Sequence, residues 1–140
     1  MKTNKEQAYL AVLDLDRAIA PLWFKSLESA GVSVNQSEVL FILGVEDASI
    51  SHLSRELGVT SSAITQTVEN LEKKQLVERK HKSSDRRVVS VLLSDKGEKC
   101  LRTLLQERYS LVNSLLDDFS EKELSQLVTL HKKMMDSIKD

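Results

Sequence analysis

The stretch GVTSSAITQTVENLEKKQLVERKHKSSDRRVVSVLLS, residues 58–94, changes its hydrophobic pattern along its length. Ile64, Val68 and Leu71 are spaced by four and three residues, which predicts a helix with one buried stripe. The segments LVER and RVVSVLL follow and are rich in β-branched residues, which favour strands. The polar KHKSSD between them predicts a hairpin with a longish exposed loop. We therefore expect a helix followed by the chain's single sheet.

A second, shorter helix is predicted just before this one. In SISHLSRELG, Ser49 is suited to cap a helix that Gly58 ends, and Thr60 is suited to cap the next. Two short helices joined by a tight glycine turn form a helix-turn-helix, whose second helix can enter the major groove of DNA. The outer face of that second helix carries small hydroxyl or amide side chains, which can reach base edges: Ser61, Ser62, Thr65 and Gln66.

Positive charge is concentrated in the hairpin segment, although the formal net charge of the whole chain is only −1. Residues 73–87 contain seven Lys or Arg against two acids, a local charge of +5, which leaves −6 elsewhere. A solvated charged loop is the simpler interpretation of such a run. Because the run follows a helix-turn-helix directly, we favour a wing whose tip residues Lys82, Arg86 and Arg87 contact phosphates or a narrow minor groove.

The N-terminal third is predicted to be helical. A helix is expected from Glu6 to about Ala30, and Pro21 inside it predicts a kink or a break, because proline removes one backbone donor. A helix of about three turns should follow, capped by Ser33 or Asn35.

After the hairpin, a long helix is predicted from Ser94 through Phe119, and Ser120 with Glu123 forms a capping box for a last helix. The helices at the two ends carry more apolar surface than a small core can cover. A second copy of the chain is the simplest partner, and an intramolecular bundle of the first and last helices is the alternative.

Composition narrows the class of protein. With 41% hydrophobic and 29% charged residues in 140, the chain should fold as a globular protein of about one domain. No window approaches the roughly 18 apolar residues of a membrane span, and acids interrupt what would be a signal-peptide core, so we expect a cytoplasmic protein without a membrane partner.

Few residues suggest catalysis or metal binding. His52, His81 and His131 lie far apart without ligand-spaced partners, and no nucleophile has a base nearby in sequence. We therefore expect no metal, no cofactor and no enzyme activity. Cys100 is the single cysteine; an inert half-buried thiol is favoured over a redox switch.

Residues 52–97 resemble the winged helix-turn-helix of the MarR family of bacterial transcriptional regulators. The resemblance is carried by LSRELGVTSSAIT for the two helices, LEKKQLVER for the passage into the first strand, and DRRVVSVLLSDKG for the wing and the next helix. It implies a mainly α fold with a small β-hairpin wing. Residues 33–93 would form the winged helix-turn-helix, and residues 1–32 and 94–140 would form a helical dimerisation region within one chain spanning 1–140.

The same resemblance implies a homodimer that binds a pseudo-palindromic operator in double-stranded DNA and acts mostly as a repressor. It also implies that a small aromatic or phenolic ligand, or cysteine oxidation, relieves the repression. By position it implies that Arg87 enters the minor groove, that Asp85 braces the wing, and that the second helix faces bases or phosphates through Ser61, Ser62, Thr65 and Gln66. Tyr9, Trp23 and Phe24 line a ligand cavity or pack in the core; the sequence leaves both open.

Two departures from the family pattern stand out. Gln66 occupies a position where many members carry arginine, and glutamine suits adenine better than guanine. Lys74 and Gln75 replace a common glycine, a change expected to affect only the end of the helix.

Two functions of different kind fit these residues. One is a dimeric, sequence-specific DNA-binding regulator, and the other is a winged-helix protein-interaction module without specific DNA binding. An uncharged polar recognition face beside a basic wing favours DNA, since a protein-binding surface would more often expose aromatic or leucine side chains.

Overall fold

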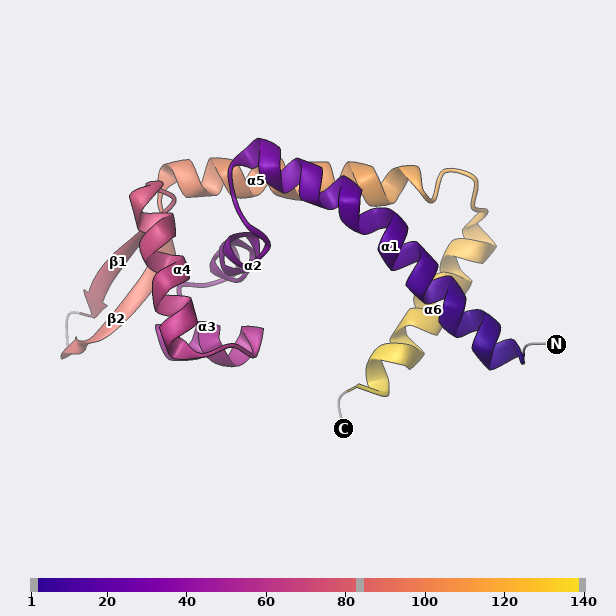
Figure 1. The fold of residues 1–140 in the computed structure, drawn as a ribbon, viewed down its shortest axis with the longest axis horizontal. Helices are drawn as coiled ribbons and strands as arrows, with labels where there is room; N and C mark the ends of the chain where they lie inside the picture. Colours follow the sequence, from indigo (N-terminus) through magenta and orange to yellow (C-terminus); the bar gives the residue numbers. More distant parts are fainter. Residues whose placement is uncertain (1–2, 83–84, 139–140) are drawn as a thin grey trace. The chain divides into compact units, whose positions relative to one another are not determined.

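The computed structural model describes residues 3–82 and 85–138, which form helices and one two-stranded sheet (Figure 1). By its internal contacts the chain divides into two compact units, Met1–Glu107 and Arg108–Asp140. The elements in chain order are α1 (Asn4–Ala30), α2 (Val34–Leu43), α3 (Ile50–Leu57), α4 (Ser61–Lys73), β1 (Val77–Lys82), β2 (Asp85–Leu93), α5 (Asp95–Ser114) and α6 (Glu121–Asp136). The predicted fold class, mainly α with a β-hairpin, is confirmed.

The helix starts follow the capping residues in the sequence. Of the two candidates for α2, Ser33 is the cap: its side chain accepts from the backbone of Gln36, and the Gln36 side chain accepts from the backbone of Ser33. This reciprocal pair satisfies two donors that the helix itself leaves free. The other predicted caps are confirmed at Ser49, Thr60 and Ser120.

Helix α1 is continuous through Pro21, so the break that the sequence left open does not occur. A proline removes one hydrogen bond from a helix interior. The helix has 27 residues and a complete capping box between Thr3 and Glu6, so its remaining hydrogen bonds are enough to keep it continuous. Only Leu27, near its C-terminal end, is buried.

The hairpin is longer than the sequence predicted. The strands pair in antiparallel register from Val77 opposite Leu93 to Lys82 opposite Asp85, with an irregularity after His81. Most of KHKSSD is therefore strand, and the prediction of a long loop is wrong. Pairing across the hairpin satisfies backbone groups that an open loop would leave to water. Residues 83 and 84 lie outside the described ranges.

The C-terminal helices also differ from expectation at one boundary. Helix α5 ends at Ser114, five residues before the predicted Phe119, and a series of turns connects it to α6. Backbone amides of Leu115, Leu116 and Phe119 each donate to a carbonyl three residues earlier, a tighter winding than the α-helix. Helix α6 has no buried residue in the single chain.

The core of the first unit lies where α2, α3, α4 and β2 meet. Leu40, Leu53, Val68, Leu71 and Val91 are completely buried there. Val91 also exchanges two backbone hydrogen bonds with Ala48, of 3.0 and 2.8 Å, which ties the hairpin to the segment before α3. The predicted stripe on α4 is thus the face that packs, and its opposite face is left to solvent.

The start of α5 lies directly against the end of the α4–β1 connection. A Cβ atom on Gly97 would lie 1.9 Å from the carbonyl oxygen of Leu76, closer than any side chain can approach. The backbone of Ser94 donates to that same carbonyl at 3.1 Å. Only glycine permits this approach, so α5 is fixed to the base of the hairpin.

We predict that Gly97→Ala destabilises the protein by about 2–3 kcal/mol or more, because the added methyl group must displace backbone rather than a flexible side chain. Gly58→Ala is the matched control: Gly58 has φ +64° but open space around its missing Cβ, so the cost there is the left-handed backbone, about 1–2 kcal/mol. Urea unfolding of both variants provides the comparison. A larger loss for Gly58→Ala would contradict the close approach.

Candidate nucleic-acid interface

The helix-turn-helix is built by α3, the Gly58 turn and α4. Gly58 adopts φ +64°, and its backbone amide caps the end of α3. Two residues later the Thr60 side chain accepts from the backbone of Ala63 at 3.2 Å and starts α4. Figure 1 places the N-terminal end of α4, helix α3 and the hairpin tip at the same end of the unit. This is the arrangement in which a helix and a wing can contact one surface.

The four residues predicted to face bases lie on the outer side of α4. Ser61, Ser62 and Gln66 are exposed, and Thr65 is half-buried. The Thr65 hydroxyl donates to the carbonyl of Ser61 at 2.8 Å. The hydroxyl proton of Thr65 is therefore already donated within the helix, so the side chain can offer DNA only an acceptor oxygen and a methyl group. In the major groove these groups suit the amines of adenine or cytosine and the methyl group of thymine.

The described part of the hairpin tip is organised by Asp85. Its Oδ1 accepts a hydrogen bond of 2.9 Å from the backbone of Arg87, whose side chain is exposed. The backbones of Lys82 and Arg86 belong to the strands, but their side chains lie outside what the structure describes. The sequence prediction for these two side chains thus stays a prediction.

Arg87 also borders a cavity of about 390 Å³ that the sequence reasoning missed. The other lining residues come from the start of α3 and from β2: Ser49, Ile50, Ser51 and Val89. The wing arginine thereby comes near the N-terminal end of the first helix of the motif. Only the capping role of Ser49 was visible in the sequence, because contact between α3 and β2 depends on tertiary packing.

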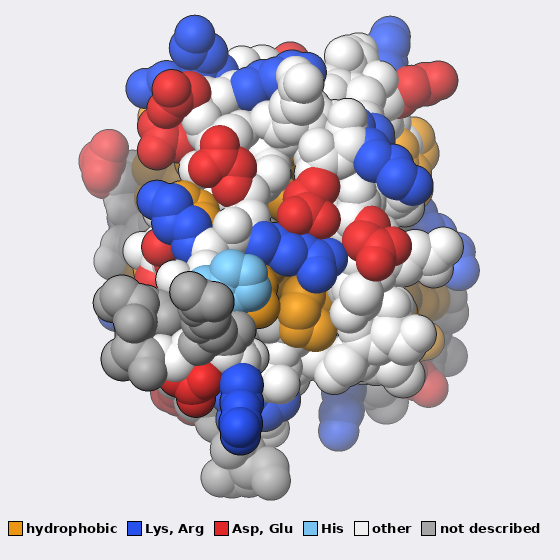
Figure 2. All heavy atoms as spheres, turned by 90° about the vertical axis from the view of Figure 1, so that its left-hand side faces the viewer, with side chains coloured by type: hydrophobic (Ala, Val, Ile, Leu, Met, Phe, Trp, Pro, Cys, Tyr) orange, Lys and Arg blue, Asp and Glu red, His pale blue; other side chains and the backbone are white. Residues whose placement is uncertain are grey.

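The cationic run of residues 73–87 does not form one patch. Arg79 pairs with Glu72 on α4, with 3.2 Å between Nε and Oε1, and the Lys74 ammonium donates to Gln36 in the first turn of α2. On the hairpin side of the unit, Lys and Arg side chains alternate with acids (Figure 2). The local charge of +5 in the sequence is therefore divided between the hairpin base, where Lys74 and Arg79 have partners within the protein, and the tip.

The histidines do not assemble a metal site in the described part of the chain. His52 Nε2 lies 3.8 Å from Glu46 Oε1 on the surface, and no group of three or more His, Cys, Asp or Glu in those ranges is placed to hold an ion. No helix in the described ranges is long and apolar enough to cross a bilayer.

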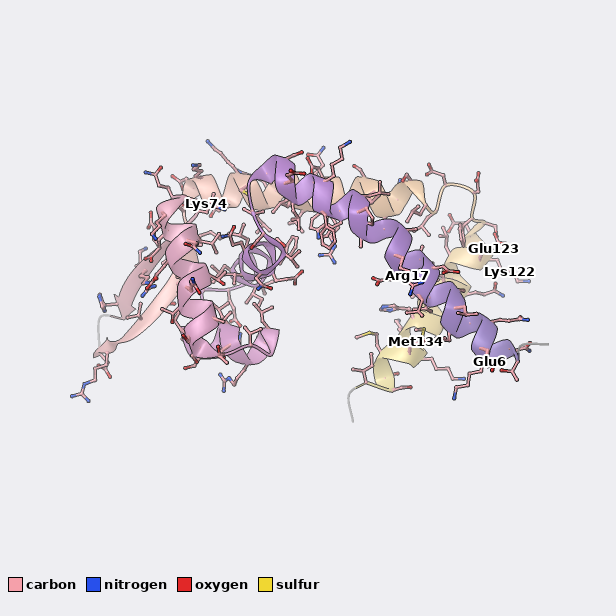
Figure 3. All side chains as sticks on the ribbon, viewed as in Figure 1. Glu6, Arg17, Lys74, Lys122, Glu123 and Met134 are labelled. Carbon is pink, nitrogen blue, oxygen red and sulfur yellow. The ribbon has the colours of Figure 1, made fainter. Side chains whose placement is uncertain are left out.

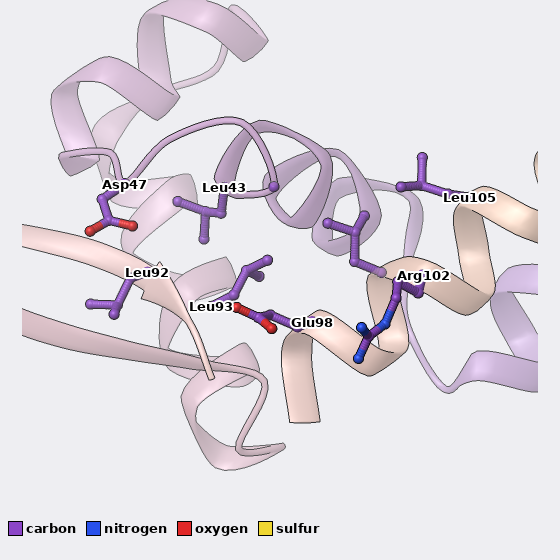
Figure 4. A pocket seen from close by; sticks show the side chains of 9 residues that line it. Leu43, Asp47, Leu92, Leu93, Glu98, Arg102 and Leu105 are labelled. Atoms are coloured by element: carbon purple, nitrogen blue, oxygen red, sulfur yellow. The ribbon is translucent and has the colours of Figure 1, made fainter. Parts of the chain in front are cut away.

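A cavity of about 420 Å³ lies beside the winged helix, between α2, β2 and α5 (Figure 4). Leucines form its apolar wall: Leu43, Leu92, Leu93, Leu101 and Leu105. Asp47, Glu98 and Arg102 provide its charged groups. The aromatic side chain of Trp23 instead stacks on Phe41, with ring centroids 6.1 Å apart, as in core packing.

Cys100 lies half-buried on α5, beside a smaller cavity of about 310 Å³ lined by Leu76, Lys96 and Lys99 among others. Burial raises the pKa of the thiol above its ordinary value, and the positive charges of Lys74 and Lys96 offset only part of that effect. At neutral pH the thiol is therefore less ionised than an exposed cysteine.

The geometry of α3, α4 and the hairpin is that of a winged helix-turn-helix protein, and known proteins with similar sequences share this motif. The sequence profile of the MarR family matches residues 30–88. The HTH-type transcriptional repressor MdtR of Bacillus subtilis is 29% identical over 126 residues, which cover 89% of this chain and 81% of MdtR. These comparisons assign residues 30–88 a likeness to the MarR family.

Solved structures agree with that assignment. The YusO protein from B. subtilis superimposes with a TM-score of 0.80 at 27% identity, over 96% of this chain and 99% of that one. The F27L mutant of S. aureus MepR bound to an oligodeoxyribonucleotide superimposes with a TM-score of 0.70 over 95% of this chain and 98% of that one. At 20% identity the second likeness is one of fold alone.

The raised pKa of Cys100 predicts slow alkylation. At pH 7 iodoacetamide should modify Cys100 more slowly than it modifies free cysteine, and the rate should keep rising at alkaline pH values where free cysteine has levelled off. Mass spectrometry of the folded protein measures the rate, and the urea-unfolded chain is the control. A folded rate at or above the unfolded one would contradict burial as the dominant influence.

Proposed function

We propose that this protein is a MarR-family, sequence-specific DNA-binding transcriptional regulator that acts as a homodimeric repressor on a pseudo-palindromic operator in the cytoplasm. The observation that carries the proposal is the exposed polar face of α4 beside a hairpin with an exposed arginine at its tip: Ser61, Ser62, Gln66 and Arg87. MdtR is named a transcriptional repressor, and the MepR mutant was solved with a bound oligodeoxyribonucleotide. Both support the proposal. We propose no catalytic role.

The division of labour on the DNA follows from chemistry. We propose that the α4 face reads bases, with Gln66 on adenine and Thr65 as an acceptor or a methyl contact. Arg87 would enter the minor groove, and Lys82 and Arg86 would contact phosphates. Asp85 holds the backbone at Arg87, so its part in binding is to shape the wing.

Dimerisation is proposed because the end helices leave much apolar surface uncovered. In the single chain Tyr9 is 62% exposed, Leu15 55% and Leu130 59%, and α6 buries no residue. Large apolar side chains exposed along a helix are typical of an interface, and a second copy is the commonest partner. We therefore propose that residues 1–32 and 94–140 form the dimerisation region and residues 33–93 the DNA-binding region.

We further propose that a small phenolic ligand relieves repression from the cavity beside α5. The leucine wall suits an aromatic ring. Two carboxylates, on Asp47 and Glu98, outnumber the single guanidinium of Arg102 in the cavity lining. This negative balance favours a neutral phenol over an aromatic acid, which is itself negatively charged. Because Leu92 and Leu93 end β2, a ligand there would act on the hairpin as well as on α5.

The proposal is tested by fluorescence anisotropy on the DNA upstream of the protein's own gene and on a scrambled duplex, at two salt concentrations. A regulator should bind the upstream duplex tightly, with a steep loss of affinity as salt rises, and sedimentation should give a dimer. A phenol that releases this duplex would support the ligand proposal. Equally weak binding to the upstream and scrambled duplexes, together with an in vitro selection that yields no operator, would favour the protein-interaction module instead.

Arg87→Ala should weaken operator binding by about 1–3 kcal/mol, because it removes a charged contact with DNA from the tip of the wing. The variant should remain a folded dimer. Lys73→Ala, which removes one exposed positive charge from the last turn of α4, is the charge-matched control and should lose less. Equal losses in the two variants would remove the wing from the mechanism.

Gln66→Ala should lower the preference for operator over random DNA, since a good side-chain pair with a base discriminates by about 1–3 kcal/mol. Competition anisotropy against random-sequence DNA measures this preference directly. Gln106→Ala, the same change at an exposed position on α5, should leave it unaltered. A uniform loss on both DNAs would instead indicate a phosphate contact by Gln66.

A further inference from the structure

The side chain of Lys74 connects the end of α4 to the junction of α1 and α2. Its Nζ donates to the carbonyl oxygen of Gly31 at 2.6 Å and to Oε1 of Gln36 at 2.8 Å. Gly31 is the residue that ends α1. Figure 3 labels Lys74 at the end of α4 that is remote from α3.

The acceptor on Gln36 is part of a fixed group. Gln36 is only 7% exposed, and its Oε1 also accepts from the backbone of Ser33 at 3.1 Å within the capping box of α2. A buried amide held in this way has little freedom to move. The ammonium of Lys74 is therefore held at a defined point relative to both α1 and α2.

The backbone beside Lys74 is held from the other side by α5 and the residue before it. Lys96 Nζ donates to the carbonyl of Lys74 at 3.0 Å, and the Ser94 hydroxyl donates to the carbonyl of Gln75 at 2.6 Å. Gln75 itself adopts φ +61°, a left-handed conformation that is costly for any residue with a Cβ. Such a conformation persists only where the surroundings impose it.

The replacement of glycine by Lys74 and Gln75 was expected to change only the end of the helix, and the structure corrects this. The lysine reaches across to α1 and α2. The position that glycine would occupy without strain is filled by Gln75 in the same conformation. This chain thus combines a strained helix end with two long-range hydrogen bonds in place of a flexible glycine.

We propose that Lys74 is a positioning residue that fixes the direction of α4 relative to α1 and α2 and so sets the half-site separation that the dimer accepts. The inference rests on the proposed function. Helix α4 has 13 residues and is about 20 Å long. A rotation of about 10° at its Lys74 end therefore moves its first turn by about 3.5 Å, close to the spacing of adjacent bases on one strand.

The test compares Lys74→Met with Lys73→Met and Lys74→Arg. Lys73 is exposed in the same last turn, so its variant removes the same charge without removing the two hydrogen bonds. Arginine retains the positive charge and carries five N–H donors. Each protein is titrated against an operator obtained by in vitro selection with the unmodified protein, and against duplexes whose half-sites are one or two base pairs closer or farther apart.

The unmodified protein, Lys73→Met and Lys74→Arg should share a sharp optimum at the selected separation. Lys74→Met should lose about three- to tenfold in affinity at that optimum. Its affinities for the other separations should fall less or rise, which flattens the profile. A role confined to stability would lower the melting temperature and leave the shape of the profile unchanged, so the shape is the deciding readout.

A Lys74→Met profile that parallels the profile of Lys73→Met overturns the proposal for Lys74 and leaves the proposed function standing. A selection that yields no operator overturns the proposed function, and the inference with it. Thermal unfolding checks that every variant is folded at the assay temperature. If Lys74→Met is not folded, Lys74→Ala replaces it in the comparison.

Discussion

The contact on which the rest of the first unit depends is the approach of Gly97 to the carbonyl of Leu76. No side chain fits between them, and Ser94 donates to that same carbonyl. The approach places the first turn of α5 on the base of the hairpin, next to the residues that end α4. Helix α4, the hairpin and α5 therefore meet at one backbone contact, and a change in the direction of the start of α5 must be transmitted to α4 unless this contact breaks.

Near the same junction, two of the cations in residues 73–87 are bound within the protein, whereas an arginine at the hairpin tip is exposed. Lys74 and Arg79, at the base, are engaged by Gln36 and Glu72, and so contribute to structure. Arg87, at the tip, has its backbone held by Asp85 and its side chain exposed. A cation that is hydrogen-bonded within the protein is less available to a phosphate than a free one. The charge in the sequence thus overstates the charge at the proposed interface.

Local signals predicted most of the helices because capping depends on residues three positions apart. Ser49, Thr60 and Ser120 were identified as caps on this basis, and Gly58 as a stop. Predictions failed where a boundary depends on partners or on competing backbone hydrogen bonds. The hairpin extends into KHKSSD because the two strands satisfy each other's backbone hydrogen-bonding groups. Helix α5 ends early because the backbone amides after it donate to carbonyls three residues earlier. Pro21 is tolerated because a long capped helix loses only one bond there.

The sequence by itself determined the resemblance to the MarR family, the order of the elements and the four side chains on the outer face of α4, since periodicity and motif spacing depend on neighbouring residues. Only the tertiary structure decided what those groups meet. It showed the Thr65 proton already donated to Ser61, Arg87 beside the start of α3, and Lys74 joined to Gly31 and Gln36. These contacts join residues whose proximity follows from chain folding and, for Lys74, from a strained turn at Gln75, which no local pattern specifies.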